Sequence, residues 1–476
     1  MGENLTKKQV SNIKAAKRAS RKKATTARKA NYKDTKRKNP VTVEVLEDGT
    51  FCFHGRSLSP TKDKNEVLEP YGKVIWNHGE QVQLLPDEEQ SQKINQTIGC
   101  ARVVRNSYLD ARIKLYTEKR ETLRGNTYKK EHLPSLKEEK PWLREVDKFA
   151  LESAIENVED AYNNFFEGRA SFPKFASRYK PNGNKYTTKF TNDNIKLFVG
   201  EEDNEPYLQL PKVGCVHVII PKGKTIDTIL PMGARITKVT VTHTGNNYTA
   251  SLSMENVIDK TAPITEYLPK RLISMDMGIR WFCDYSCGDG HYEHVDNPKW
   301  INKHSKKLRR LQKALSRKKY DKKKHKGSHN WAKCKTKVAK EQRKIANQRK
   351  DFHHKLSRKI ADSCDVFVCE NLNISGMMRN RRMAKQIASV GWYQFLMFVK
   401  YKLEKKGGIF LKVDRFFPSS KLCKCGYKHK ELKQGDRFWI CPKCHSFHDR
   451  DDNAVENLRT EGMRILGEEG ILMKTA

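Results

Sequence analysis

The sequence Arg-Leu-Ile-Ser-Met-Asp-Met-Gly-Ile-Arg occupies residues 271–280 and has the pattern of a buried strand that carries one acid. The apolar run Leu272–Met275 leads directly into Asp276, and Gly278 follows two residues later. Short continuous apolar runs favour a central strand that is covered on both faces. A carboxylate on such a strand is costly to bury unless a cation pairs with it. Asp276 is therefore a candidate metal ligand.

Two further acids occupy comparable places in the sequence. The short apolar strand predicted at Asp365–Cys369 ends on Glu370. Asp451 lies where a late helix is expected to begin, and the pattern favours it at the N-cap, although Asp449 and Asp452 compete for the role of third acid. Capping alone would explain an aspartate there, but three acids in these positions together indicate a metal centre.

The three carboxylates suit two-metal hydrolysis of a phosphodiester. Carboxylate oxygens are hard ligands that Mg²⁺ or Mn²⁺ prefers, and a shared carboxylate can hold two ions about 3.5–4 Å apart. Asp276, on the central strand, is the expected bridging ligand, while Glu370 and Asp451 would each complete one side. A strand with an aspartate, a hairpin at Trp281–Cys287 and a third strand to Val295 resembles the start of an RNase H-like nuclease core.

A cysteine cluster precedes the third acid. Cys423 and Cys425 are separated by one residue, and after fifteen intervening residues Cys441 and Cys444 are separated by two. Two close pairs across such a loop predict a tetrahedral structural zinc site. Because a one-residue spacer is unusual in this turn, a histidine is an alternative ligand, and the candidates are His429, His445 and His448.

The positive charge is concentrated in two blocks. The 476-residue chain has a formal net charge of +38. Residues 1–40 hold 14 Lys/Arg against 2 acids, and residues 301–360 hold 24 against 3. Charge placed in blocks is typical of a surface that binds a polyanion, so we expect nucleic acid as the partner.

No stretch approaches the roughly 18 apolar residues of a membrane helix, and no secretory signal is visible. The 12 cysteines then indicate reduced thiols and metal ligands, and we expect a cytoplasmic protein.

The rest of the chain alternates between helical and strand patterns. Apolar periodicity predicts helices over 94–115 and 151–165, with Gly168 as the C-terminal cap of the second. Short strands between 172 and 254, together with Gln81–Leu85, predict a small antiparallel barrel. Two long basic helices are expected within 303–360, followed by a helix near Val390–Lys405 and a strand at Ile409–Val413.

Several motifs together resemble the RuvC nuclease half of TnpB proteins, the transposon-encoded RNA-guided nucleases related to compact type V CRISPR effectors. The similarity covers roughly residues 81–460. Its motifs are Ser-Met-Asp-Met-Gly-Ile-Arg, Cys-Glu-Asn-Leu-Asn-Ile, Asp-Arg-Phe-Phe-Pro-Ser-Ser-Lys, the paired cysteines and His-Asp-Arg-Asp-Asp-Asn-Ala, with Gln-Lys-Ile-Asn-Gln-Thr and Ser-Phe-Pro-Lys-Phe upstream. The short Cys-x-Cys pair and the long basic N-terminus depart from the family pattern.

The resemblance implies a multidomain α/β protein. Its fold would be an RNase H-like (RuvC) core with a zinc-ribbon insert, plus a wedge β-barrel that carries a helical recognition insert. By the same resemblance, Asp276, Glu370 and Asp451 match the three RuvC acids. The expected domains are a basic arm and hairpin (1–80), the first part of the wedge barrel (81–95), the recognition lobe (96–173), the wedge barrel (174–262), the RuvC core (263–415), the zinc ribbon that binds target nucleic acid (416–448) and the RuvC C-terminal helix (449–476).

The function implied is an RNA-guided DNA endonuclease that binds a guide RNA and double-stranded target DNA beside a short flanking motif. Two alternatives remain open at this point. A guide-dependent DNA-binding protein without cleavage would be marked by loss of an acid. An RNA-independent transposase or resolvase would not need the upstream helical lobe and barrel. Family membership leaves open whether the protein is a TnpB or a CRISPR effector, and whether it is a monomer or a homodimer.

Overall fold

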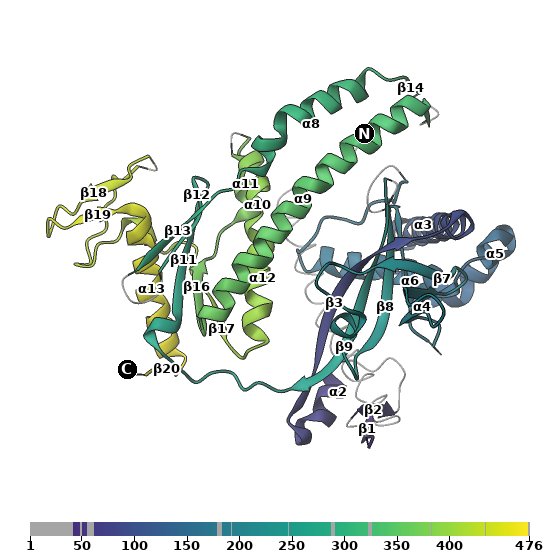
Figure 1. The fold of residues 1–476 in the computed structure, drawn as a ribbon, viewed down its shortest axis with the longest axis horizontal. Helices are drawn as coiled ribbons and strands as arrows, with labels where there is room; N and C mark the ends of the chain where they lie inside the picture. Colours follow the sequence, from purple (N-terminus) through teal and green to yellow (C-terminus); the bar gives the residue numbers. More distant parts are fainter. Residues whose placement is uncertain are drawn as a thin grey trace. The chain divides into compact units, whose positions relative to one another are not determined.

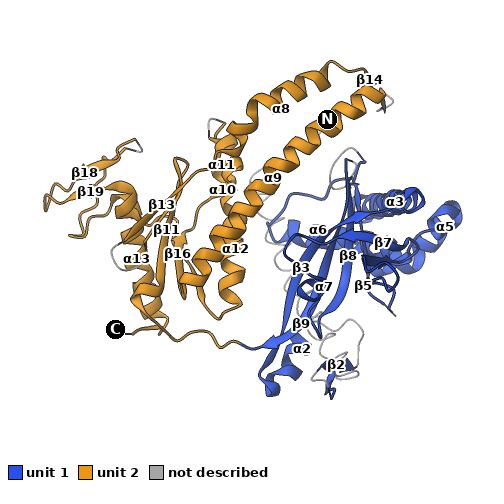
Figure 2. Cartoon of the chain, viewed as in Figure 1, with its two compact units in different colours: residues 1–260 blue, residues 261–476 orange. Residues whose placement is uncertain are grey.

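The computed structural model describes residues 41–47, 50–54, 61–178, 183–191, 193–245, 247–286, 291–321, 326–381, 383–433 and 435–474. The basic arm predicted at residues 1–40 and the turn predicted at Gly288–Gly290 lie outside these ranges. The chain forms two compact units, residues 1–260 and 261–476 (Figure 2). Each unit is described separately.

The first unit is built on a seven-stranded antiparallel sheet whose core is one apolar cluster (Figure 1). β4 and β5 are its edges, and these two strands do not pair with each other among the described residues. The strands therefore form an open sheet here, and a closed barrel stays a prediction. In spatial order they are β4 (Lys185–Lys189), β8 (Arg235–Thr244), β9 (Asn247–Asp259), β3 (Lys73–Leu85), β7 (Gly214–Ile219), β6 (Pro206–Leu210) and β5 (Lys196–Val199).

β3 is much longer than the strand predicted at Gln81–Leu85. It begins at Lys73 and pairs continuously with β9, from Lys73 opposite Asp259 to Leu84 opposite Tyr248. Its first half contains Asn77, His78, Gly79 and Glu80, which hide the apolar alternation from a sequence reading. Pairing with β9 therefore extends a strand that local propensity would end.

Two long helices pack against this sheet. α3 (Glu88–Lys119) begins with a capping box between Asp87 and Gln90. α6 (Lys148–Phe166) is capped by Asp147 and ends next to Gly168, whose φ of 76° confirms the predicted C-terminal cap. The polar connection between them contains α4 (Gly125–Thr127) and α5 (Leu133–Glu139), and the few apolar side chains of this connection join a second core with α3 and α6.

The second unit is built on a mixed five-stranded sheet. β12 pairs antiparallel with both β11 and β13, while β11, β16 and β17 run parallel to one another. α9 and α12 cover one face of the sheet, and α13 covers the other. In spatial order the strands are β13 (Tyr292–Asp296), β12 (Trp281–Ser286), β11 (Leu272–Met277), β16 (Val366–Glu370) and β17 (Ile409–Val413), and the helices are α9 (His329–Ser363), α12 (Trp392–Glu404) and α13 (Arg450–Glu468).

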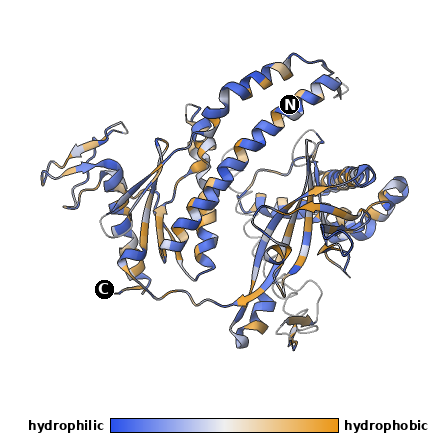
Figure 3. Ribbon diagram, viewed as in Figure 1, coloured by the Kyte–Doolittle hydropathy of each residue, from blue (hydrophilic) through white to orange (hydrophobic). Residues whose placement is uncertain are grey.

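The two basic helices predicted within 303–360 are α8 (Trp300–Ser316) and α9, both mostly hydrophilic along their length (Figure 3). The helix predicted at Val390–Lys405 is confirmed as α12, and a further helix, α11 (Ala384–Val390), precedes it, with Gly391 in a left-handed conformation between the two. The shorter elements are β1 (Thr42–Val45), β2 (Phe51–His54), α2 (Thr61–Leu68), α7 (Ile226–Ile229), β10 (Glu266–Tyr267), β14 (Tyr320–Asp321), β15 (Lys326–Gly327), α10 (Ile374–Met377), β18 (Phe438–Ile440), β19 (Phe447–Asp449) and β20 (Leu472–Met473).

Among the helices that the structure describes, none combines the length and the apolar character needed to cross a membrane.

α13 lies against β16 closely enough to require a glycine. A Cβ on Gly462 would stand 2.6 Å from the Cγ2 atom of Val368, a buried β-branched side chain that cannot move away. We expect Gly462→Ala to lower the free energy of unfolding by about 1–2 kcal/mol, as overpacking does. The matched control is Gly467→Ala on the same helix, where a Cβ meets no atom within 4 Å. That variant should be neutral or stabilising by about 0.5–1 kcal/mol, since alanine favours helix. Equal urea midpoints for the two variants would contradict this packing.

Candidate carboxylate centre and cysteine site

The sheet of the second unit places two of the predicted acids on one face. Met275 of β11 pairs with Cys369 of β16 in parallel register, so the next residues, Asp276 and Glu370, stand side by side at the strand ends. Adjacent strands lie about 4.7–4.9 Å apart. Because side chains alternate, both acids share the face of Leu272, which packs under α13.

α13 brings the third acid, Asp451, toward this face. The prediction that Asp451 caps the helix is wrong, because Asp449 is the N-cap and its Oδ1 accepts the Asp451 amide at 2.9 Å. Asp449 also pairs with Arg437 at 3.2 Å. The carboxylate of Asp451 is thus not used for capping, and its charge acts on Asp276.

Polar contacts fix the elements around these acids. The Ser419 hydroxyl donates to Glu370 Oε1, and Asn457 of α13 donates to the carbonyls of Ser419 and Leu422, both at 2.7 Å. Arg459 donates from α13 to the Leu272 carbonyl at 2.7 Å, which ties the helix to the start of β11. The Pro-Ser-Ser-Lys segment therefore links the second acid to the helix of the third.

The closeness of these acids affects the ionisation of Asp276. Burial, and then the charges of Glu370, Asp451 and Asp284, raise the pKa of the Asp276 carboxyl to about 7. Like charges gathered in a buried place are stable only with a proton or a cation among them. The donors are all carboxylate oxygens, which fit Mg²⁺ or Mn²⁺.

Asp284 is an acid that the sequence reasoning missed. It stands on β12 directly opposite Asp276 and is buried. Its Oδ1 lies 2.5 Å from Nδ1 of His294, whose Nε2 is 4.0 Å from Asp452. The hydrogen bond to Asp284 raises the pKa of His294. A polar residue inside the alternating strand Trp281–Ser286 was the available signal.

A cavity of about 640 Å³ opens beside Glu370. Lys400, Lys412 and Arg415 line it together with Tyr393, whose ring is 65% exposed. Cations suit phosphate groups, and an exposed aromatic ring can stack on a base. This cavity, which Glu370 lines but the other acids do not, therefore has the chemistry of a nucleic-acid strand site.

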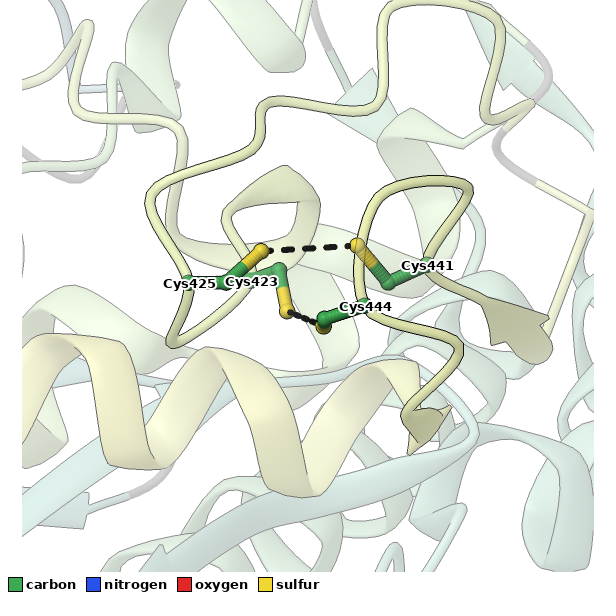
Figure 4. A group of neighbouring side chains, drawn as sticks. All are labelled: Cys423, Cys425, Cys441 and Cys444. Carbon is green, nitrogen blue, oxygen red and sulfur yellow. Dashed lines mark hydrogen bonds between the residues drawn. The ribbon is translucent and has the colours of Figure 1, made fainter.

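The four predicted cysteines converge on one point (Figure 4). Their sulfur atoms all lie within 4.8 Å of one another, with 3.5 Å between Cys423 and Cys444 and 3.6 Å between Cys425 and Cys441. Zn–S bonds of about 2.3 Å in a tetrahedron put sulfurs about 3.8 Å apart. The one-residue spacer of the first pair thus does not prevent a four-sulfur zinc site.

Two side chains support the cysteines from outside this set. Ser446 Oγ lies 3.1 Å from Cys444 and 3.3 Å from Cys423, and its hydrogen bonds lower the pKa of the Cys444 thiol to about 6. His448 Nε2 lies 3.2 Å from Cys423 and 2.9 Å from Ser446. Of the three histidines considered as replacements, His448 therefore contacts a ligand sulfur, but all four cysteines are already in place.

Comparisons with known proteins identify the family of the chain. A family model described as "Probable transposase" (OrfB of IS605) matches residues 256–381, and one described as "Cas12f1-like, TNB domain" matches 392–458. A third, described as "Helix-turn-helix domain", matches 77–121, which in this structure is the end of β3 followed by the single helix α3.

A protein of Streptomyces pristinaespiralis named "Putative RNA-guided DNA endonuclease" is 30% identical over 385 residues, 79% of this chain and 87% of its own length. InsQ of Escherichia coli K12, with the same description, is 26% identical over 69% of this chain and 78% of its own. A solved Cas12f1–sgRNA–target DNA complex matches with a TM-score of 0.47 at 14% identity, covering 85% of this chain and 87% of that one. The chain belongs to the TnpB family of transposon-encoded proteins, as its motifs predicted.

The cysteine geometry predicts about one zinc per chain, which elemental analysis of the purified protein measures. Cys441→Ser should lower the zinc content well below that of the parent, because the remaining three ligands bind more weakly. Cys215→Ser, at an exposed cysteine of the first unit, is the control and should keep full zinc. His448→Ala should also keep it. Full zinc in a Cys423→Ser, Cys425→Ser double variant would show instead that histidines are the ligands.

Proposed function

We propose that this protein is an RNA-guided DNA endonuclease that hydrolyses DNA phosphodiester bonds at Asp276, Glu370 and Asp451. The observation that carries the proposal is that Asp276 and Glu370 lie on the sheet face that α13 covers, while Asp451 belongs to α13, and that burial and the charges of these neighbours raise the pKa of Asp276. The sheet order, three antiparallel strands followed by two parallel ones, supports an RNase H-like (RuvC) core. The printed names of the relatives support the same activity.

Each acid has a distinct task in this proposal. Asp276, on the central strand, would bridge two Mg²⁺ or Mn²⁺ ions, while Glu370 and Asp451 would each hold one side. When bound, such ions lower the pKa of an attacking water and stabilise the leaving 3′ oxygen. Ser419 orients Glu370 by its hydrogen bond, and α13 keeps Asp451 over the sheet through Arg459. The chain thus supplies a fixed set of oxygen ligands on rigid elements.

Nucleic acid would approach through the basic surfaces. Lys400, Lys412 and Arg415 beside Glu370 would hold the backbone of the strand to be cut. Residues 301–360, with 24 Lys/Arg against 3 acids, would meet further phosphates. A guide RNA would read the target by base pairing after a short flanking DNA motif is bound.

The predicted domains fit this division of tasks. Residues 96–173 would form the recognition lobe, inserted between the parts of the wedge domain at 81–95 and 174–262. Residues 263–415 and 449–476 would form the nuclease core, and the cysteine ribbon at 416–448 would bind target nucleic acid. The ribbon's exposed aromatic pair, Phe438 and Phe447, with ring centres 5.6 Å apart, suits stacking on bases.

The proposed function leads to two predictions, of which the first concerns catalysis. Asp276→Ala should lower the rate of Mg²⁺-dependent DNA cleavage by more than about 100-fold, since even residues that only support metal ligands are worth about 10–100-fold. DNA binding should change little, because affinity comes mostly from phosphate contacts. The control is Asp296→Ala, at an exposed acid of β13 in the same sheet, which should cut like the parent. An Asp276→Ala enzyme that still cuts at a comparable rate would disprove the assignment.

The second prediction separates function classes. The protein should co-purify with a specific structured RNA, and deleting residues 1–40 should weaken that complex without abolishing it, because the larger positive block at 301–360 remains. Sequencing the bound RNA measures this. The alternative suggested by the "Probable transposase" description is a nuclease that needs no RNA. It would carry a random RNA pool and would cut DNA equally well after that RNA is removed.

A further inference from the structure

The first unit contains a cationic cavity to which no function has been assigned. Its volume is about 230 Å³, and it lies between α3, α6 and β4, with Ala176 and Gly183 also in its lining. Arg102, Arg105 and Lys185 line it together with Tyr186 and Asn157. None of the described residues that line it is acidic. The cavity therefore carries an excess of positive charge.

Two of the residues that line the cavity each have a buried polar atom without a partner. Arg105 Nη1 and the Tyr186 hydroxyl make no hydrogen bond among the residues that the structure describes. The Tyr186 side chain belongs to the core and is only 3% exposed. An unpaired buried donor costs about 1–3 kcal/mol, so two donors at one cavity need an explanation.

The surroundings do not neutralise these donors. Arg102 donates to the Gly183 carbonyl at 2.8 Å, which fixes its guanidinium at the cavity wall. Burial is the main cause that raises the pKa of Tyr186, and the charge of Asp147 raises it further. Its carboxylate is already engaged by the Phe149 and Ala150 amides at 3.0 and 3.1 Å and by the Thr188 hydroxyl. Burial lowers the pKa of Arg105, which means that burial destabilises its charged guanidinium. A bound anion would offset this destabilisation.

Size and chemistry limit the ligand. A cavity of about 230 Å³ is smaller than the ~300–1,000 Å³ of pockets that enclose whole organic ligands. Guanidinium groups bind phosphate oxygens in a forked geometry, and a tyrosine hydroxyl can donate to the same group. We propose that this cavity binds one phosphate group of a nucleic-acid backbone, held by Arg105 and Tyr186 with Arg102 and Lys185 beside them. That the ligand is a phosphate follows from the cavity, whereas its nucleic-acid source rests on the proposed function.

The test compares substitutions in the full-length protein freed of bound nucleic acid at high salt. The probes are a labelled poly(U) RNA, a labelled DNA duplex and unlabelled inorganic phosphate. Arg105→Gln should weaken RNA or DNA binding by about 10- to 100-fold, the value of a charge-assisted hydrogen bond. It should also reduce the salt dependence of binding by about one phosphate contact. Tyr186→Phe, which removes only a hydroxyl, should weaken binding about 3-fold or more.

The control is Lys119→Gln, which removes one charge from an exposed position of the same helix, α3. It should change affinity by no more than about 2-fold. Neither Arg105→Gln nor Tyr186→Phe should lower the melting temperature of the nucleic-acid-free protein, because Arg105 Nη1 and the Tyr186 hydroxyl have no partner among the described residues.

Three results would overturn the proposal. One is unchanged affinity in both cavity variants. Another is an equal loss in Lys119→Gln, which would show that only total charge matters. In the third result, inorganic phosphate raises the melting temperature of the parent, but the two cavity variants bind nucleic acid as tightly as the parent does. This result would mean that the cavity binds a free anion. Cleavage is not measured, so failure of the proposed nuclease activity would leave this test intact.

Discussion

The repulsion between carboxylates on one face of the second unit's sheet is the constraint on which the rest of the site depends. Asp276 and Glu370 occupy adjacent strand ends, Asp284 stands opposite Asp276, and Asp451 is added from α13. Burying such a group costs several kcal/mol per charge unless protons or cations are shared among them. Such a gathering of charges does not favour stability, which is why we propose that the arrangement binds cations.

The architecture around the acids serves to hold them against that repulsion. α13 is fixed to β11 through Arg459 and to the Ser419 segment through Asn457, while its apolar side chains pack on the sheet with Leu272 and Val368. Gly462 lets the helix approach β16 closely. The opposite face carries the large apolar core with α9 and α12. Rigid packing on both faces is what allows a cluster of like charges to persist.

Sequence predicted the elements that have strong local signals. The apolar strands that end in Asp276 and Glu370, the basic helices and the cysteine pairs were all recognisable, because burial and charge leave clear patterns. It did not predict the first half of β3, which is a strand only because β9 pairs with it. It placed Asp451 at the N-cap because Asp449 and Asp451 both suit that position, and only the backbone separates them. Asp284 and the Arg105–Tyr186 cavity arise from contacts between distant segments, which a one-dimensional pattern does not contain.

The most direct test of the account is a titration of Mn²⁺ into the zinc-loaded protein, followed by electron paramagnetic resonance. The parent is compared with a variant in which Asp276→Asn, Glu370→Gln and Asp451→Asn are combined. These substitutions keep shape but remove the charges that a divalent cation needs. The account predicts that the parent binds Mn²⁺ with a bound-ion signal that the variant lacks. Equal Mn²⁺ binding by both proteins would contradict it, because the cations would then be held elsewhere.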